Sequence, residues 1–237
     1  MRRPIVAGNW KMHGSRSLVE DFACSLEGRK GVDVIVFPPA LYLPLAVERL
    51  EGAEVGVQNV HLEKAGAYTG EVAAEMAAEM GARYALVGHS ERRRLFSETD
   101  EIVAGKYGAA LRAGLVPILC VGETLEERRE GRQAEVVLSQ LDVVLGAGVQ
   151  GSVVIIAYEP VWAIGTGETA TPSEAQSMHA TIRAALGDAD IRILYGGSVT
   201  AENAGALFAE DDIDGGLVGG ASLEPASFNA ITYAADQ

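Results

Sequence analysis

The feature that most constrains the fold is a pattern of eight apolar runs, each followed by a segment with the signals of a helix. Several runs are apolar at consecutive positions, which is typical of strands buried on both faces of a parallel sheet. Their spacing of about 30 residues matches that of βαβ units. The predicted strands cover residues 5–10, 32–37, 53–58, 84–88, 115–121, 153–158, 191–195 and 213–218.

Three helix starts carry the pattern of a capping box, in which a Ser or Thr and a Glu three residues later satisfy each other's backbone amides. The predicted boxes begin at Ser17, Thr124 and Thr171. Each box stabilises a helix start by about 1 kcal/mol, so we expect helices to begin at these positions.

Two of the predicted helices have readable apolar faces. The helix after Thr124 is predicted to be long, with an apolar face formed by Val137, Leu141 and Leu145. The helix after Thr171 has apolar residues at helical spacing, namely Ala175, Met178, Ile182 and Ala185. His179 in the same helix is predicted to be a surface residue rather than a metal ligand.

Alternating strands and helices can close into a barrel or form an open, doubly wound sheet. An open sheet that binds a dinucleotide carries G-x-G-x-x-G after its first strand, whereas here that strand ends in Gly8-Asn9-Trp10-Lys11. We therefore predict an α/β fold of the closed (β/α)8 type. Residues 1–237 are expected to form a single barrel domain, a size common for such domains.

Charge and cysteine content limit the classes of partner. With 19 basic and 33 acidic residues the chain has a formal charge of −14, which disfavours nucleic acid and anionic membranes as partners. We find no secretory leader pattern and no apolar run near the ~20 residues that span a bilayer. Cys24 and Cys120 lack metal-ligand spacing and are predicted to be reduced thiols of a cytoplasmic protein.

Three polar side chains follow predicted strands, and in a barrel the chemistry lies at the carboxyl ends of the strands. Lys11 follows the first strand, His89 the fourth and Glu159 the sixth. Taken singly, each has an ordinary explanation: a solvated lysine, a hydrogen-bonded loop histidine or a solvated carboxylate. Together at one mouth they would supply a cation, an imidazole able to transfer a proton, and a base.

Paired glycines follow the last two predicted strands, Gly196-Gly197 before Ser198 and Gly219-Gly220 after the eighth strand. One pair alone often marks only a turn, but two pairs at neighbouring strand ends let backbone N–H groups approach an anion. Phosphate binding recurs at this place in barrels. Because the four histidines show no metal-binding spacing and no G-x-S-x-G motif occurs, the chemistry left is proton transfer on a small phosphorylated carbonyl compound.

Over its full length the sequence resembles the triosephosphate isomerase family. The segment after the sixth predicted strand is the most specific part of the resemblance. The matching segments are residues 7–12 (AGNWKM), 58–60 (QNV), 66–71 (GAYTGE), 87–93 (VGHSERR), 120–123 (CVGE), 157–167 (AYEPVWAIGTG), 195–198 (YGGS) and 218–223 (VGGASL). The resemblance implies a TIM barrel that interconverts D-glyceraldehyde 3-phosphate and dihydroxyacetone phosphate without a cofactor, in glycolysis and gluconeogenesis.

The resemblance implies roles for four catalytic positions. Glu159 would be the base that moves a proton between neighbouring carbons, and His89 would polarise the carbonyl as a neutral imidazole. The neutral state of this histidine comes with the family and is not a deduction from the residues. Lys11 and Asn9 would stabilise negative charge on the substrate and on the enediolate intermediate.

The resemblance also implies supporting and binding positions. Glu91 would support Lys11, while Tyr195 and Ser198 would hold a loop of residues 160–166 closed over the intermediate. Closure would keep water away from an enediolate that could otherwise eliminate phosphate. The substrate-binding positions implied are Asn9, Lys11, Gly165, Ser198, Gly219 and Gly220.

A homodimer is a further implication of the resemblance, with the loop of residues 60–71 inserting into the partner. Glu71 and Arg92 would form a structural ion pair. The chain departs from the family pattern at His13, where asparagine is usual, and this position is expected to affect the dimer contact rather than catalysis.

Two alternatives to this function stay open. One is another phosphate-binding barrel enzyme that interconverts an aldose and a ketose, which the loop sequence at 157–167 disfavours. The other is a non-catalytic barrel that binds a partner, which would require the loss of Lys11, His89 or Glu159. All three are present, and substrate profiling would separate the first alternative from the family's reaction.

Overall fold

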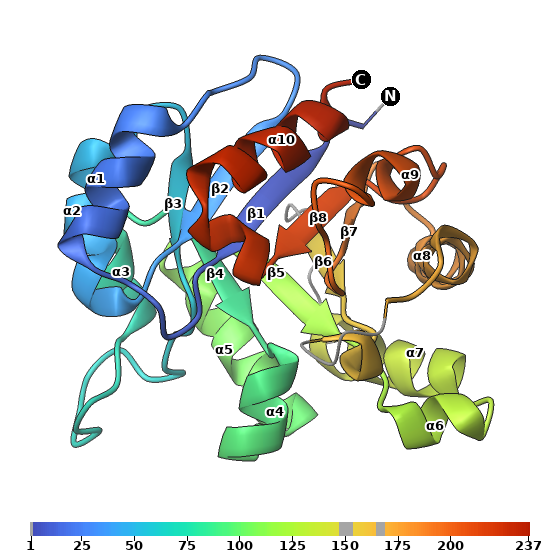
Figure 1. The fold of residues 1–237 in the computed structure, drawn as a ribbon. Coiled ribbons are helices and arrows are strands. Elements are labelled where there is room, and N and C mark those ends of the chain that lie inside the picture. Colours follow the sequence, from blue (N-terminus) through green and yellow to red (C-terminus); the bar gives the residue numbers. More distant parts are fainter. Residues whose placement is uncertain (1, 147–153, 165–168) are drawn as a thin grey trace.

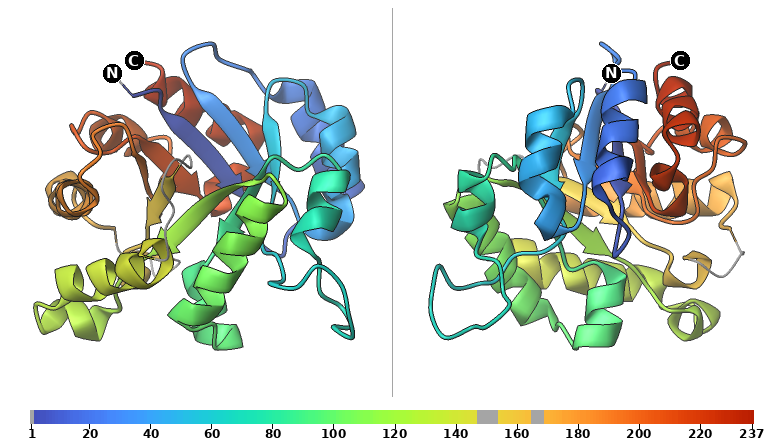
Figure 2. Two further views of the ribbon diagram at one scale, coloured as in Figure 1. Left: turned by 180° about the vertical axis from the view of Figure 1, so that it is seen from behind. Right: turned by 60° about the vertical axis from the view of Figure 1, so that its left-hand side comes forward.

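The computed structural model describes residues 2–146, 154–164 and 169–237 and shows a closed barrel of eight parallel strands surrounded by helices (Figures 1 and 2). The strands follow one another in sequence order, and β8 closes the barrel against β1. The predicted (β/α)8 TIM-barrel fold is confirmed. Both chain termini lie at the same end of the barrel (Figure 1).

Each strand lies inside its predicted run and is one or two residues shorter than the prediction. The strands are β1 (Ile5–Asn9), β2 (Asp33–Phe37), β3 (Glu54–Val57), β4 (Tyr84–Val87), β5 (Val116–Val121), β6 (Ile155–Tyr158), β7 (Arg192–Tyr195) and β8 (Gly215–Val218). The apolar runs therefore locate the strands, and only their ends are set by the hydrogen bonds to neighbouring strands.

The helices form the outer layer of the barrel. They are α1 (Arg16–Ser25), α2 (Leu43–Arg49), α3 (Ala74–Glu79), α4 (Ser90–Phe96), α5 (Asp100–Arg112), α6 (Leu125–Arg129), α7 (Gln133–Leu145), α8 (Pro172–Leu186), α9 (Ala204–Phe208) and α10 (Pro225–Ala235). Short 3₁₀ helices are η1 (Ala40–Tyr42), η2 (Val161–Ala163) and η3 (Gly220–Leu223). No helix in the described ranges has the length and apolar character needed to cross a membrane.

Two of the three predicted capping boxes are confirmed, at Thr124 and Thr171. The box at Ser17 is wrong, because α1 begins two residues earlier with Ser15 as its cap. The Ser15 hydroxyl accepts a hydrogen bond from the Leu18 backbone N–H at 3.0 Å. Ser17 lies inside the first turn, where its hydroxyl contacts that of Ser15.

The long helix predicted after Thr124 is also wrong, because the segment forms α6 and α7 with a break at Gly131. The backbone of Gly131 has a φ of 73°, which ends the first helix in the left-handed region that glycine adopts without strain. Of the predicted apolar face, Val137 and Leu141 are buried, while Leu145 is only half-buried.

The surface position predicted for His179 is wrong, because the side chain is fully buried. The buried face of α8 consists of Ala175, Met178, His179 and Ile182, whereas Ala185 is exposed. His179 fits the helical spacing of that face. A contact between its Nδ1 and the carbonyl oxygen of Asp212 at 3.2 Å gives the imidazole a polar partner in the interior.

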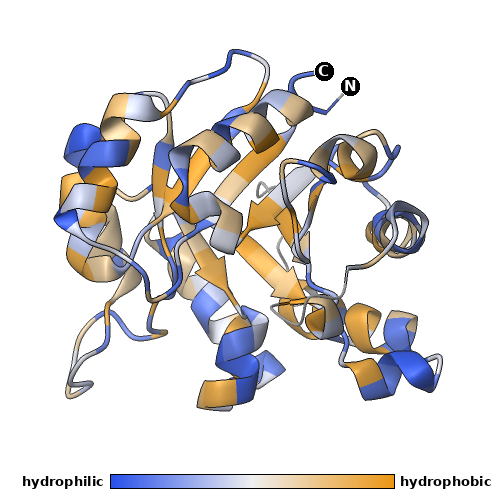
Figure 3. Cartoon of the chain, in the orientation of Figure 1, coloured by the Kyte–Doolittle hydropathy of each residue, from blue (hydrophilic) through white to orange (hydrophobic). Residues whose placement is uncertain are grey.

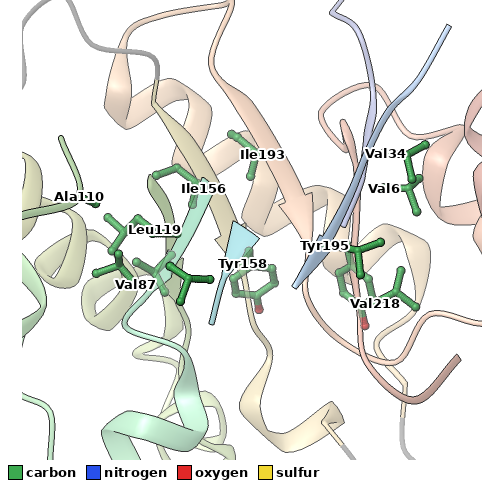
Figure 4. Packing of buried hydrophobic residues seen from close by; sticks show 14 of the residues in the cluster. Val6, Val34, Val87, Ala110, Leu119, Ile156, Tyr158, Ile193, Tyr195 and Val218 are labelled. Atoms are coloured by element: carbon green, nitrogen blue, oxygen red, sulfur yellow. The ribbon is translucent and has the colours of Figure 1, made fainter. Parts of the chain in front are cut away.

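The apolar side chains form two separate cores, one inside the barrel and one between the barrel and the helices. Because side chains alternate along a strand, Ile155 and Ala157 of β6 lie in the inner core, and Ile156 and Tyr158 lie in the outer one. Figure 3 shows the strands as the most hydrophobic part of the chain, and Figure 4 shows part of the outer core.

A first prediction concerns Gly122, which follows β5 and lies against the backbone of Glu159. A Cβ at Gly122 would overlap the carbonyl oxygen of Glu159, so Gly122→Ala is expected to lower the free energy of unfolding by about 3 kcal/mol. The control is Gly108→Ala in α5, where a Cβ meets nothing within 4 Å. Since alanine favours a helix, this control is expected to raise the same quantity by about 0.5–1 kcal/mol. Urea unfolding measures both, and equal effects would contradict the clash.

Candidate active site

The alternation of side chains along the strands carries two polar residues into the mouth of the barrel. Ile5 and Ala7 of β1 face the inner core, so the next residue in step, Asn9, lies at its carboxyl end. The same count along β6 leads from Ala157 to Glu159, which is buried. Both side chains line one cavity of about 260 Å³.

His89 reaches this cavity because of a glycine. Leu86 faces the inner core and Val87 the outer one, so strict alternation would turn His89 outward. Gly88 has a φ of 75°, which breaks the extended conformation after β4. His89 then caps helix α4 and lines the cavity.

The cavity collects most of the predicted site residues. Its lining consists of Asn9, Lys11, His89, Glu159, Ile164, Gly196, Gly197, Ser198, Val199, Thr200, Leu217, Gly219, Gly220 and Ala221. Of the other predicted positions, Glu91 contacts Lys11 without lining the cavity, and Tyr195 is buried on the outer side of the sheet. Gly165, together with Thr166 of the predicted loop, lies outside the described residues.

The carboxylate of Glu159 has two polar neighbours at the start of α4. Its Oε2 accepts a hydrogen bond from the backbone N–H of Ser90 at 2.8 Å, and its Oε1 lies 2.9 Å from Nε2 of His89. A charged carboxylate that is 1% exposed needs such partners, since burial without them would cost several kcal/mol. His89 also lines the cavity, so Glu159 can act as a base on a molecule bound there.

The tautomer of His89 follows from its hydrogen bond to α4. The backbone N–H of Glu91 donates to Nδ1 at 3.2 Å, so a neutral imidazole carries its proton on Nε2, facing the cavity. Burial lowers the pKa of His89, but the carboxylates of Glu159 and Glu91 raise it by more, so its pKa lies above the ordinary value while Glu159 stays in contact.

Lys11 is held in an unusual backbone conformation, with a φ of 51°. This left-handed geometry costs a non-glycine residue about 1–2 kcal/mol. Asn9 accepts the backbone N–H of Lys11 through Oδ1 at 3.0 Å, and the Gln58 amide donates to the Lys11 carbonyl at 2.8 Å. These bonds fix the turn that brings the lysine to the cavity.

The ammonium group of Lys11 donates to Oε1 of Glu91 at 2.6 Å. Burial raises the pKa of Glu91, and the hydrogen bond and charge of Lys11 lower it by more, so the pair is an ion pair at neutral pH. The Lys11 side chain also lies over Gly219, where an added Cβ would meet its Cε at 3.5 Å.

The glycines after β8 leave room for a ligand against the backbone, whereas those after β7 pack against Tyr158, Glu159 and Tyr195. A Cβ at Gly220 would meet nothing within 4 Å, so the backbone of that residue faces open space in the cavity. The Ser198 hydroxyl donates to the carbonyl of Ala163 at 2.8 Å, which joins the β7 loop to the loop after β6. Backbone N–H groups and a lysine at one end of the cavity suit an anion such as phosphate.

The ion pair predicted between Glu71 and Arg92 does not form within the chain. Arg92 instead pairs with Glu98, with Nε 2.6 Å from Oε1, and Glu71 is exposed. Glu98 is buried and also contacts the ammonium group of Lys106. The buried carboxylate of Glu98 attracts Arg92 more strongly than a solvated carboxylate would, because water screens the two charges less there.

Sequence reasoning missed two residues that shape the site. Gln58 was part of the family resemblance, but no role was predicted for it. Its side-chain amide donates to the carbonyl oxygens of both Lys11 and Phe37. Ser90 acts through its backbone N–H, which no side-chain pattern could reveal; the only signal was its position after His89 at a helix start. Within the described ranges, no cluster of His, Cys, Asp and Glu is arranged to hold a metal ion.

Comparisons with known proteins show the family of the chain. The sequence model of the family described as triosephosphate isomerase matches residues 4–235. The chain is 51% identical over 250 residues to the triosephosphate isomerase of Xanthomonas axonopodis pv. citri and 53% identical over 248 residues to that of Stenotrophomonas maltophilia strain K279a. It is 52% identical over 245 residues to that of Alcanivorax borkumensis. In each case 99% of both chains is covered.

A second prediction concerns the pH dependence of stability through His179. Burial lowers its pKa from 6.5 to about 4, so the unfolded chain takes up a proton before the folded one. The stability of the folded chain should therefore fall between pH 6.5 and 4 by about 3 kcal/mol. His179→Gln cannot titrate and should lack this component. Denaturant unfolding at pH 7 and pH 4 measures it, and a constant difference between the two proteins would contradict the prediction.

Proposed function

The chain belongs to the triosephosphate isomerase family and is an isomerase, and we propose that its chemistry takes place in the cavity at the barrel mouth. The reaction is the reversible interconversion of D-glyceraldehyde 3-phosphate and dihydroxyacetone phosphate through an enediolate. One observation carries the proposal: Glu159 and His89 lie 2.9 Å apart in a cavity that also holds Lys11 and both glycine pairs.

The phosphate of the substrate binds at the glycine end of the cavity. The backbone N–H groups of Gly219, Gly220 and Ser198 donate to its oxygens. Lys11 supplies positive charge at the cavity, although the net charge of the whole chain is −14. This placement directs the three-carbon part of the substrate toward Glu159 and His89. We extend the phosphate contact to Gly165 on the strength of the family resemblance alone.

Glu159 is the base of the reaction. Its carboxylate takes a proton from the carbon next to the carbonyl, and the electron pair left behind moves to the carbonyl oxygen. The same carboxylate then returns a proton to the neighbouring carbon. A second proton passes from the neighbouring hydroxyl to the former carbonyl oxygen. Two protons therefore change places within the molecule, and no outside oxidant or reductant is needed.

His89 and Lys11 stabilise the negative charge that develops on oxygen. The proton on Nε2 of His89 faces the cavity and donates to the carbonyl oxygen as it becomes an enediolate. When substrate separates His89 from Glu159, the nearest charge that raises the His89 pKa is removed. Burial and the backbone N–H at Nδ1 then both favour the neutral imidazole. Asn9 supports the lysine turn and faces the same oxygens.

The two alternative functions have less support. In a non-catalytic barrel, a buried carboxylate that lines a cavity would cost stability without serving a reaction. A different aldose–ketose isomerase is disfavoured because relatives at 51–53% identity over 99% of their length carry the name triosephosphate isomerase. Assays with longer sugar phosphates distinguish this second case.

The dimer is proposed from one exposed face of the chain. The loop of residues 60–71 projects from the barrel (Figure 1), and Tyr68 on it is 46% exposed and stacks on His61. Met12, next to Lys11, is 95% exposed. Exposed apolar side chains of this size, one of them on a projecting loop, are typical of a protein interface.

We place the protein in the cytoplasm. Cys24 and Cys120 are both free thiols, as expected in a reducing compartment. The substrate is a phosphorylated metabolite, which is consistent with that location.

A third prediction tests the base. Glu159→Ala is expected to lower turnover of glyceraldehyde 3-phosphate by at least ~10²-fold, the lower end for a positioned proton transfer. A coupled spectrophotometric assay measures it, with Glu126→Ala on the exposed side of α6 as the control. Near-normal turnover in the Glu159 variant would refute the assignment, and inactivity of the unaltered protein on trioses would refute the function.

A fourth prediction tests the dimer. Light scattering should give a mass twice the 24.9 kDa of one chain. Met12→Glu places a charge in the proposed interface and should shift the mass toward a single chain. Val143→Glu on α7 is the matched control, because Val143 is 38% exposed and α7 lies far from the loop of residues 60–71 (Figures 1 and 2). A single-chain mass for the unaltered protein would contradict the proposal.

A further inference from the structure

The imidazole of His179 lies between two tyrosines behind the active site. Tyr158 and Tyr195 are paired residues of β6 and β7, and their rings point out of the barrel toward the helix layer, with both hydroxyls directed the same way (Figure 4). The ring centroid of His179 is 5.7 Å from that of Tyr158 and 6.4 Å from that of Tyr195. All three side chains are buried.

One nitrogen of His179 is committed to the backbone. Its Nδ1 lies 3.2 Å from the carbonyl oxygen of Asp212, which can only accept, so Nδ1 carries the proton. The burial that lowers the pKa to about 4 keeps the ring neutral. Nε2 is therefore a bare acceptor, and among the described residues no group donates to it.

The hydroxyl of Tyr195 is a hydrogen-bond donor without an acceptor. It is buried, and no acceptor for its proton lies within hydrogen-bond geometry in the described part of the chain. Burial raises the pKa of Tyr195 to about 12, whereas the backbone N–H of Ala170 acts in the opposite direction. By contrast, the Tyr158 hydroxyl already donates to Glu123 at 3.1 Å.

We propose that the Tyr195 hydroxyl and Nε2 of His179 are joined through one buried water, which accepts the hydroxyl proton and donates to Nε2. An unpaired donor and an unpaired acceptor on adjacent buried rings each cost free energy, and one water bound to both groups removes this cost. The hydrogen bond to this water also fixes the hydroxyl rotor so that the oxygen lone pairs face the N–H of Ala170. His179 is then a positioning residue, acting through Tyr195.

The consequence for the active site follows from where these residues lie, and it rests on the proposed function. Tyr195 directly precedes Gly196 and Gly197, which line the cavity. An added Cβ at Gly197 would overlap the Tyr195 hydroxyl, so this hydroxyl packs against the backbone of the glycine pair. A fixed hydroxyl therefore keeps the pair in place against the phosphate and disfavours elimination of phosphate from the enediolate.

The test uses two substitutions, each of which keeps one of the two hydrogen-bonding functions of the imidazole. His179→Asn keeps a donor where Nδ1 is and removes the acceptor at Nε2, whereas His179→Gln keeps an acceptor near Nε2 and removes the link to Asp212. We expect His179→Asn to lower kcat about fivefold, the worth of one hydrogen bond, and to raise the inorganic phosphate released per turnover. His179→Gln should stay within about twofold of the unaltered protein, as should Ser177→Ala on the exposed face of α8.

The reverse order, or equal loss in both variants, would overturn the proposal, because a role limited to the Asp212 contact predicts that result. A double-mutant cycle adds a second check. In a Tyr195→Phe background, which lacks the hydroxyl, His179→Asn should cause no further loss of kcat, and a full further loss would count against the bond.

A spectroscopic measurement covers the case in which His179→Asn does not fold. In protein with ¹⁵N-labelled histidine, Tyr195→Phe should move the Nε2 resonance of His179 and leave its Nδ1 resonance in place. An unmoved Nε2 resonance would overturn the proposal. Since this readout needs no turnover, it separates a failure of the inference from a failure of the proposed isomerase reaction.

Discussion

The alternation of side chains along a closed parallel barrel is the constraint on which the site depends. Each strand of this barrel is buried on both faces, so every second side chain enters the inner core and the others pack under the helices. At the carboxyl ends of β1 and β6, the last inward-facing apolar residues are followed by Asn9 and Glu159, which occupy the next inward positions. The alternation that places apolar side chains in the inner core therefore also places these polar side chains in the site.

The polar residues at the mouth persist in a buried setting because each has a fixed partner. Glu159 contacts the backbone N–H of Ser90 and the imidazole of His89. The ammonium group of Lys11 donates to Glu91, and its backbone carbonyl accepts from the Gln58 amide. For the buried carboxylate of Glu159, loss of a partner would leave the charge uncompensated, which costs more than the bond itself is worth. The half-buried pair of Lys11 and Glu91 depends less on its bond, because water can reach both groups. This mutual dependence keeps base, imidazole and cation at fixed separations, as proton transfer requires.

Local patterns predicted the parts of the structure that local forces decide. The capping boxes at Thr124 and Thr171 were found because both partners lie within one turn of helix. The burial of His179 and the pairing of Arg92 with Glu98 were missed. In the first case the deciding partner, Asp212, lies 33 residues away. In the second, the pairing depends on the depth at which Glu98 is buried, which the separation in sequence does not show.

The sequence by itself determined the barrel, the place of each strand and the set of residues at the strand ends, because apolar periodicity and glycine placement act within a few residues. Only the tertiary structure decided which atoms of those residues meet. The positive φ of Gly88 turns His89 inward, and the closing of the strands brings its Nε2 within 2.9 Å of a carboxylate 70 residues further along. Such a distance depends on every strand between the two residues, since each one adds to the rotation around the barrel.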